Sequence, residues 1–207
     1  MSGSTYPRRL AVVSWALVFA VVFIWSLISP ADLLTWMLEV SPAVAALIIL
    51  GLTYKRFPLT PLVYFLILFH CVILMVGGHY TYAKVPLFDI ISEMTGSGRN
   101  NYDKFAHFFQ GLVPAMIARE LLIRFKVVSG QYWMTFIIVS ICLAISAFYE
   151  LIEWMVAVIS DTAAEAFLGT QGYEWDTQSD MALALLGACF ALIFLSRLHD
   201  RQLSTLP

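Results

Sequence analysis

The stretch "LAVVSWALVFAVVFIWSLI", residues 10–28, decides the fold class. It contains no charged residue, and a helix needs about 20 apolar residues, at about 1.5 Å each, to cross the hydrocarbon core of a bilayer. The whole chain is 60% hydrophobic and only 13% charged, which is outside the usual composition of soluble domains. We therefore predict an integral membrane protein whose helices lie in a lipid bilayer.

The two arginines before this run, Arg8 and Arg9, are also typical of a cleaved signal peptide. The apolar run is too long for one, and the following "ISPADLL", residues 28–34, has no small-residue cleavage site. An uncleaved first helix is the better interpretation.

Five further apolar runs follow the first. They cover residues 33–53, 59–76, 105–123, 132–159 and 181–195. The last run is short for a bilayer, so its helix is expected to begin earlier. Most of the 207 residues belong to such runs, which leaves no room for a separate soluble domain. We predict a single domain, residues 1–207, that is an all-α polytopic membrane helical bundle with about six transmembrane helices.

The basic residues predict the orientation of the bundle, because Lys and Arg are retained on the cytoplasmic side. They occur at every second connection: Arg8, Arg9, Lys55, Arg56, Arg124, Lys126, Arg197 and Arg201. The last of the other connections carries acids and no base: Asp161, Glu165, Glu174 and Asp176. Both termini are therefore predicted to be cytoplasmic. The net charge of −2, with no basic face, argues against a nucleic-acid partner.

Ionisable residues gather at the outer ends of the predicted spans, although a charge in a membrane segment is costly and usually functional. Asp103 and His107 are four residues apart, and Glu150 and Glu153 are three apart, so each pair shares one helix face. Asp180 opens the last apolar run, where it could also simply cap the helix. We predict that these five residues form one polar cluster and are the candidate catalytic residues.

Carboxylates this close cannot all stay ionised without compensation. Imidazole and carboxylate ligands suit Zn, Mn or Fe, so a divalent metal held by His107, Asp103 and Glu150 is one hypothesis. Shared protons, the nearby Lys104 or Arg99, or the amine of a substrate are others. The same groups could act as acid and base, or could only hold the helices together by hydrogen bonds.

Four more polar residues are expected at the same outer end and are candidate substrate-binding residues: His79, Tyr82, Gln171 and Asp176. The connection over residues 77–102 is long enough to fold over this end of the bundle as a lid.

Some ionisable residues receive a plainer interpretation. Arg119 and Glu120 are expected to snorkel or pair near the cytoplasmic end, and His199 to belong to a solvated tail. His70 is interpreted as an isolated, hydrogen-bonded packing histidine. Glu39 either joins the outer cluster or lies at the membrane interface.

Four stretches of the chain resemble the YjdF family of bacterial inner membrane proteins. They are "GGHYTYAKVP" (77–86), "NYDKFAHFFQGLVPAM" (101–116), "YELIEW" (149–154) and "FLGTQGYEWDTQSDMALALLGA" (167–188). The resemblance extends over essentially the whole chain. It implies a location in the bacterial inner membrane and no particular reaction.

A more distant similarity reaches the VanZ-like membrane family. Its pattern joins Asp-Lys-x-x-His-Phe, a later Glu, and a final Asp leading to Gly, which here are Asp103, Lys104, His107, Phe108, Glu150, Asp180 and Gly187. Glu153 stands where that family usually has Gln, and Ala184 where it usually has Asn. That family is associated with glycopeptide antibiotic tolerance, so the similarity implies cell-envelope chemistry.

Three functions follow from these features. The leading hypothesis is that the outer cluster binds or processes a lipid-linked or amphipathic envelope molecule, with catalysis left open. The alternatives are a proton-coupled small-molecule transporter, which needs ionisable residues continuing inward, and a non-catalytic membrane scaffold.

Overall fold

The computed structural model describes residues 5–159 and 170–206, and every regular element in them is a helix. The elements are α1 (Thr5–Leu27), α2 (Leu33–Thr53), α3 (Pro61–Tyr80), α4 (Pro86–Thr95), α5 (Tyr102–Arg124), α6 (Gln131–Ile159), α8 (Asp176–Phe190), the π-helical η1 (Ala191–Leu195) and α9 (Ser196–Leu203). The predicted all-α class is thus confirmed. Asp161 and Glu165 lie outside the described residues.

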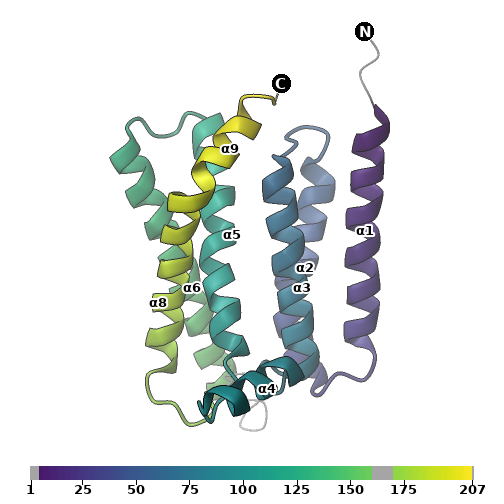
Figure 1. Ribbon diagram of the computed structural model, residues 1–207, viewed down its shortest axis with the longest axis vertical. Helices are drawn as coiled ribbons and strands as arrows, with labels where there is room; N and C mark the ends of the chain where they lie inside the picture. Colours follow the sequence, from purple (N-terminus) through teal and green to yellow (C-terminus); the bar gives the residue numbers. More distant parts are fainter. Residues whose placement is uncertain (1–4, 160–169, 207) are drawn as a thin grey trace.

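Five of the described helices are long and apolar enough to cross a membrane. They correspond to every predicted span except residues 105–123, where α5 carries several polar and charged side chains. α5 nevertheless runs alongside the others (Figure 1), so six spans remain a prediction. The last helix begins at Asp176, earlier than the apolar run itself, as expected. α1 begins and α9 ends at the same end of the bundle (Figure 1), while the side of the membrane remains a prediction.

The bundle consists of two groups of three helices. α2 and α1 both pack on α3, whereas α5, α6 and α8 pack on one another. The two groups meet mainly where α3 contacts α5, with a smaller contact between α3 and α9 (Figure 1). Buried apolar side chains such as Met75 and Met116 fill this contact. Any site between α2 and α6 therefore lies at the seam of the two groups.

The closest approach of two helices is that of α5 and α8, which share the most extensive contact in the bundle. A Cβ atom on Gly111 would overlap the carbonyl oxygen of Ala184, and one on Gly187 would overlap that of Phe108. Small residues at a membrane interface allow this proximity. Because α5 carries Asp103 and α8 carries Asp180 at their adjoining ends, the glycine contacts bring these carboxylates together.

The predicted lid segment contains α4, which lies across the end of the bundle where α3 ends and α5 begins (Figure 1). Phe88 anchors it by contacting Tyr102 and Phe105. Its other face is exposed and apolar at helical spacing, through Leu87, Ile90, Ile91 and Met94. Such a face is typical of a helix in the membrane interface. Closure of this segment as a lid remains a prediction.

Candidate functional site

The five candidate catalytic residues lie together at the α4 end of the bundle, which we call the outer cluster. His107 Nε2 lies 3.4 Å from Asp103 Oδ1 and 3.8 Å from Glu150 Oε1. Three side chains, those of Asp103, His107 and Asp180, each offer one possible ligand atom. These three atoms all lie within 4.8 Å of one another. Glu153 is 8% exposed, and none of the five exceeds 9%. The predicted meeting of α5, α6 and α8 at one level is thus present in the geometry.

The ring of His107 is oriented by Gln110, one helical turn further along α5. His107 Nδ1 lies 2.8 Å from Gln110 Oε1. Because an amide oxygen only accepts, Nδ1 carries the proton and donates it to Gln110. Nε2 therefore faces the carboxylates, where it can hold a proton or bind a cation.

The outer cluster has more acceptor oxygens than donors. Oδ1 of Asp180 and Oε1 of Glu150 are buried and have no hydrogen-bond partner among the described residues. Buried polar atoms in native proteins are almost always satisfied, so each exception calls for an explanation. In a ligand site, the explanation is a group that the ligand supplies.

Two of the candidate substrate-binding residues form the rim of the outer cluster instead of pointing into it. Asp176 Oδ1 accepts from Arg99 Nη2 at 2.5 Å, and Arg99 Nη1 donates to the carbonyl of Thr170. Gln171 accepts from the backbone N–H of Asn100 and donates to its carbonyl, at 3.0 and 2.8 Å. These bonds tie the segment before α5 to the segment before α8.

The other two candidates lie apart from each other. His79 Nδ1 is 3.0 Å from the carbonyl oxygen of Ser26, and its ring lies against Trp25 at 4.6 Å, so it joins α3 to α1 away from the outer cluster. Tyr82 is 7% exposed and lines the cavity described next. Burial raises the pKa of the Tyr82 hydroxyl well above its ordinary value, so this group is a neutral donor.

A cavity of about 200 Å³ adjoins the outer cluster at the seam between the two helix groups. Its lining consists of Glu39, Pro42, His70, Leu74, Tyr82, Asp103, Ala106, His107, Gln110, Pro114, Ile145, Tyr149 and Glu153. Pro42 of α2 and Ile145 of α6 line the cavity and are also exposed on the outer surface of the bundle. The cavity thus combines ionisable side chains with apolar ones, and two of its apolar residues reach the outer surface of the bundle.

Glu39 lines this cavity, so of the two interpretations of its position the structure favours a place beside the outer cluster over one at the membrane interface. It is 3% exposed, and its Oε2 accepts from the hydroxyl of Tyr149 at 2.7 Å, so the bond links α2 to α6 across the seam. His70 also lines the cavity, and its Nε2 has no hydrogen-bond partner in the described part of the chain. That nitrogen is buried, as expected of a packing residue, but the hydrogen bond expected of His70 is not found at it within the described residues.

The sequence reasoning missed Tyr149 and Gln110. Both were detectable from helical spacing: Tyr149 shares a face with Glu153, four residues on, and Gln110 shares one with His107, three residues before it. Neither residue type carries a formal charge at neutral pH, so neither stands out in an apolar helix as a buried charge does.

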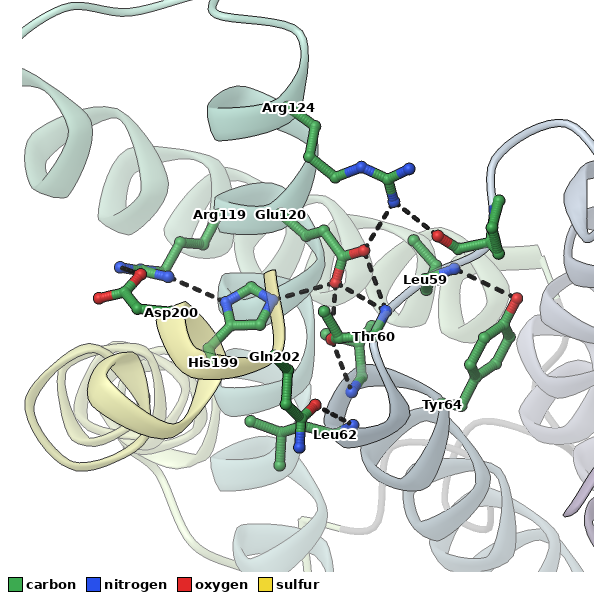
Figure 2. A network of polar contacts seen from close by, with 12 residues as sticks. Leu59, Thr60, Leu62, Tyr64, Arg119, Glu120, Arg124, His199, Asp200 and Gln202 are labelled. Carbon is green, nitrogen blue, oxygen red and sulfur yellow. Dashed lines mark hydrogen bonds and ion pairs between the residues drawn. The ribbon is translucent and has the colours of Figure 1, made fainter. Parts of the chain in front are cut away.

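A second polar group, the inner network, lies at the opposite end of the bundle (Figure 2). The carboxylate of Glu120 accepts from the backbone N–H and hydroxyl of Thr60, from His199 Nε2 at 3.0 Å and from Arg124 at 2.9 Å. Arg119 contacts His199 Nδ1 at 3.0 Å and Asp200 at 2.7 Å. Arg119 and Glu120 were expected to snorkel or pair, and each has an ionic partner: Asp200 for Arg119 and Arg124 for Glu120. The prediction of a solvated His199 is wrong, because its ring lies between Arg119 and Glu120 of α5 and is 0% exposed.

The hydrogen bonds also fix the protonation of His199. An arginine can only donate, so Nδ1 accepts from Arg119 and the ring proton is on Nε2, which donates to Glu120. His199 is a neutral ring between a cation and an anion. All its hydrogen-bonding capacity is used within the protein, in contrast with that of His107.

The helices and their hydropathy define the class of this protein as a multi-pass membrane protein. The family model described as "Predicted membrane protein (DUF2238)" matches residues 11–201. The chain is 53% identical over 188 residues to the inner membrane protein YjdF of Escherichia coli (strain K12), covering 91% of this chain and 90% of that one. It therefore belongs to the YjdF family, as the resemblance predicted, and its location is the bacterial inner membrane. No solved structure matches the chain.

Proposed function

We propose that the protein binds an amphipathic or lipid-linked envelope molecule at the outer leaflet, with the polar end of that molecule against the outer cluster. The observation that carries this proposal is the cavity beside the cluster, whose lining is polar at Asp103, His107 and Glu153 and includes the apolar residues Pro42 and Ile145, which are also exposed on the bundle. We infer that the cavity opens between these two residues. A molecule that spans both regions needs a polar head and an apolar body.

The volume of the cavity limits how much of the ligand the protein can enclose. Pockets that enclose a drug-sized ligand measure roughly 300–1,000 Å³, whereas this cavity measures about 200 Å³. It accommodates a head group or one chain segment and not a whole lipid. The remainder of the ligand then stays in the bilayer, outside the opening at Ile145.

The same geometry supports chemistry on the bound head group. His107 Nε2 and the carboxylates of Asp103, Glu150 and Asp180 lie close enough to exchange a proton with one ligand atom, which is the arrangement that general acid–base catalysis requires. Tyr82 is a neutral donor on the cavity wall. In this proposal Gln171 and Asp176 hold the rim in place.

Lipid analysis of the purified protein tests the proposal. We compare wild type, His107→Ala, Ile145→Trp and Leu151→Trp, each purified in mild detergent and checked for folding by size exclusion. Leu151 is the matched control, because it is on α6 and 59% exposed but does not line the cavity. Wild type and Leu151→Trp should retain an enriched amphipathic molecule that Ile145→Trp and His107→Ala lose. Identical lipid content in all four proteins would refute the proposal.

A proton-coupled transporter is the second candidate, favoured by one observation. Glu39 and His70 line the same cavity as His107, so ionisable groups extend inward from the outer cluster, as a relay requires. Proteoliposomes with an internal pH dye and a potassium diffusion potential test it. Transport predicts acidification that His70→Ala abolishes, and no proton movement in wild type removes this candidate.

A further inference from the structure

We propose that Asp103, His107 and Asp180 bind a divalent metal ion, with Glu150 as a fourth ligand. This inference rests on the proposed function only in that both concern the outer cluster. It differs from the set expected from the sequence, because Asp180 of α8 joins Asp103 and His107 in the compact triad.

The spacing of the three side chains fits a metal after a small adjustment. Their ligand atoms lie within 4.8 Å of one another. Around a tetrahedral ion with bonds of about 2.1 Å, ligand atoms are roughly 3.4 Å apart. In this proposal, rotation of the Asp103 and Asp180 side chains on metal binding closes this difference. Glu150 Oε1 is 3.8 Å from His107 Nε2, within the same range.

The ring of His107 is held as metal-binding histidines are held. Such a histidine almost always donates its second ring N–H to a carboxylate or carbonyl oxygen, which fixes the tautomer and aims the other nitrogen at the metal. Gln110 provides that oxygen at 2.8 Å from Nδ1. Nε2 then faces carboxylate oxygens, and the repulsion between its lone pair and those oxygens is relieved by a proton on Nε2 or, in this proposal, by a metal ion between them.

The charges of the outer cluster call for such a cation. Asp180 is 2% exposed, and its Oδ1 has no hydrogen-bond partner among the described residues. The nearby basic side chains have other contacts: Arg99 binds Asp176, and the ammonium group of Lys104 lies 4.4 Å from the ring centroid of Tyr173. A divalent ion supplies both the positive charge and the missing partner of Asp180.

The ligand types define the class of metal. One imidazole with two or three carboxylates suits Zn²⁺, Mn²⁺ or Fe²⁺, whereas Mg²⁺ and Ca²⁺ favour oxygen ligands alone. Zn²⁺ and Mn²⁺ are stable in air and are the appropriate probes.

Metal content of the purified full-length protein tests the inference. Wild type, Asp180→Asn, His107→Ala, Gln110→Leu and Glu174→Gln are each incubated with Zn²⁺ or Mn²⁺, desalted, and measured by mass spectrometry for bound metal and by thermal unfolding. Glu174→Gln is the control, because Glu174 is an exposed carboxylate in the turn just before α8, the helix that carries Asp180. Asp180→Asn keeps nearly the same side-chain shape, so the metal site can still be tested if His107→Ala fails to fold.

Wild type and Glu174→Gln should hold one metal per chain with a raised Tm, and Asp180→Asn and His107→Ala neither. Gln110→Leu should bind roughly 10- to 100-fold more weakly, because it removes only the partner that orients His107. Wild type without stoichiometric metal, or metal retained in Asp180→Asn, overturns the inference. Lipid content of the same samples separates the two proposals: lipid without metal refutes the metal site alone, and metal without lipid refutes the proposed function alone.

Discussion

The outer cluster and the inner network each place a buried histidine beside a buried carboxylate, at opposite ends of one bundle, but only the inner network contains arginines, and the two differ in how far their hydrogen bonds are satisfied. In the inner network, Glu120 accepts from Thr60, His199 and Arg124. In the outer cluster, Asp180 and Glu150 each retain a buried oxygen without a partner in the described residues. A satisfied network stabilises a fold, whereas an unsatisfied one costs stability unless a ligand completes it.

The two groups also act differently on the seam between the helix groups. The inner network joins Thr60, just before α3, to α5 and α9, so it closes the seam at one end. The outer cluster adjoins the cavity, where the hydrogen bond from Tyr149 to Glu39 links α2 to α6. The seam is thus closed by charged hydrogen bonds at one end and contains a cavity towards the other, which suits a protein that admits a ligand from the membrane.

The largest expected effect of a single substitution comes from breaking the inner network. His199→Ala removes a donor from buried Glu120 and an acceptor from Arg119, and hydrogen bonds to charged groups contribute about 1.5–3 kcal/mol each. We expect a loss of about 3 kcal/mol or more in the free energy of unfolding, measured by SDS titration in mixed micelles. Asp200→Ala is the control on the same helix: its side chain is 58% exposed, so its loss should cost about 1 kcal/mol or less. Equal effects would contradict a structural role for the network.

The contact of α5 with α8 should give the next largest effect. Gly111→Ala forces a methyl group onto the carbonyl of Ala184, and overpacking of this kind costs about 1–3 kcal/mol. Because the helices must separate, the variant should also bind less ligand at the outer cluster. Gly51→Ala on α2 is the control, since nothing lies within 4 Å of its added Cβ atom. It should leave binding unchanged and stabilise the helix slightly.

A carboxylate at the outer end that does have a partner should behave differently from the outer cluster. Asp32 caps α2 by accepting from the backbone N–H of Thr35 at 2.7 Å, and this bond lowers the pKa of Asp32. Asp32→Ala should cost about 1 kcal/mol at neutral pH. A lowered pKa means that the contribution is complete above the ordinary value of 3.8 and is lost as pH falls through the folded-state value. Unfolding titrations at several acidic pH values measure this, and a cost that grows at low pH would contradict the cap.

The smallest effect on stability should come from the outer cluster itself. Glu153→Gln removes one of several close carboxylates, so reduced like-charge repulsion offsets the lost contacts. We expect the free energy of unfolding in ligand-free protein to stay within about 0.5 kcal/mol of wild type. Binding of the co-purified molecule should nevertheless fall. A large loss of stability would show that the cluster only holds the helices together, as the scaffold hypothesis states.

The outer cluster was largely predictable from the sequence, because a charged residue in an apolar helix is a strong signal of a site. Helical spacing placed Asp103 with His107 and Glu150 with Glu153, and the alternation of spans placed both pairs at one end. The start of the last helix at Asp176 followed from the bilayer thickness.

The inner network was not predictable in the same way. His199 follows Arg197 in a polar tail, and only the continuation of α8 through η1 into α9 brings its ring against Glu120. The ion pair between Arg99 and Asp176 likewise depends on the segment before α5 meeting the start of α8. Contacts between distant segments depend on tertiary packing, which residue spacing within one helix does not encode.

One matched pair of substitutions tests the central claim most directly: Glu120→Gln in the inner network and Glu150→Gln in the outer cluster, compared for the free energy of unfolding and for bound ligand in the same preparations. Both replace a buried carboxylate by an amide of the same shape. Glu120→Gln should destabilise the protein by about 2 kcal/mol or more, because an amide N–H₂ then faces donors, and should keep ligand in the folded fraction. Glu150→Gln should retain stability and lose ligand. The reverse pattern, or equal losses of stability with no change in ligand, would contradict the assignment of structure to one end of the bundle and function to the other.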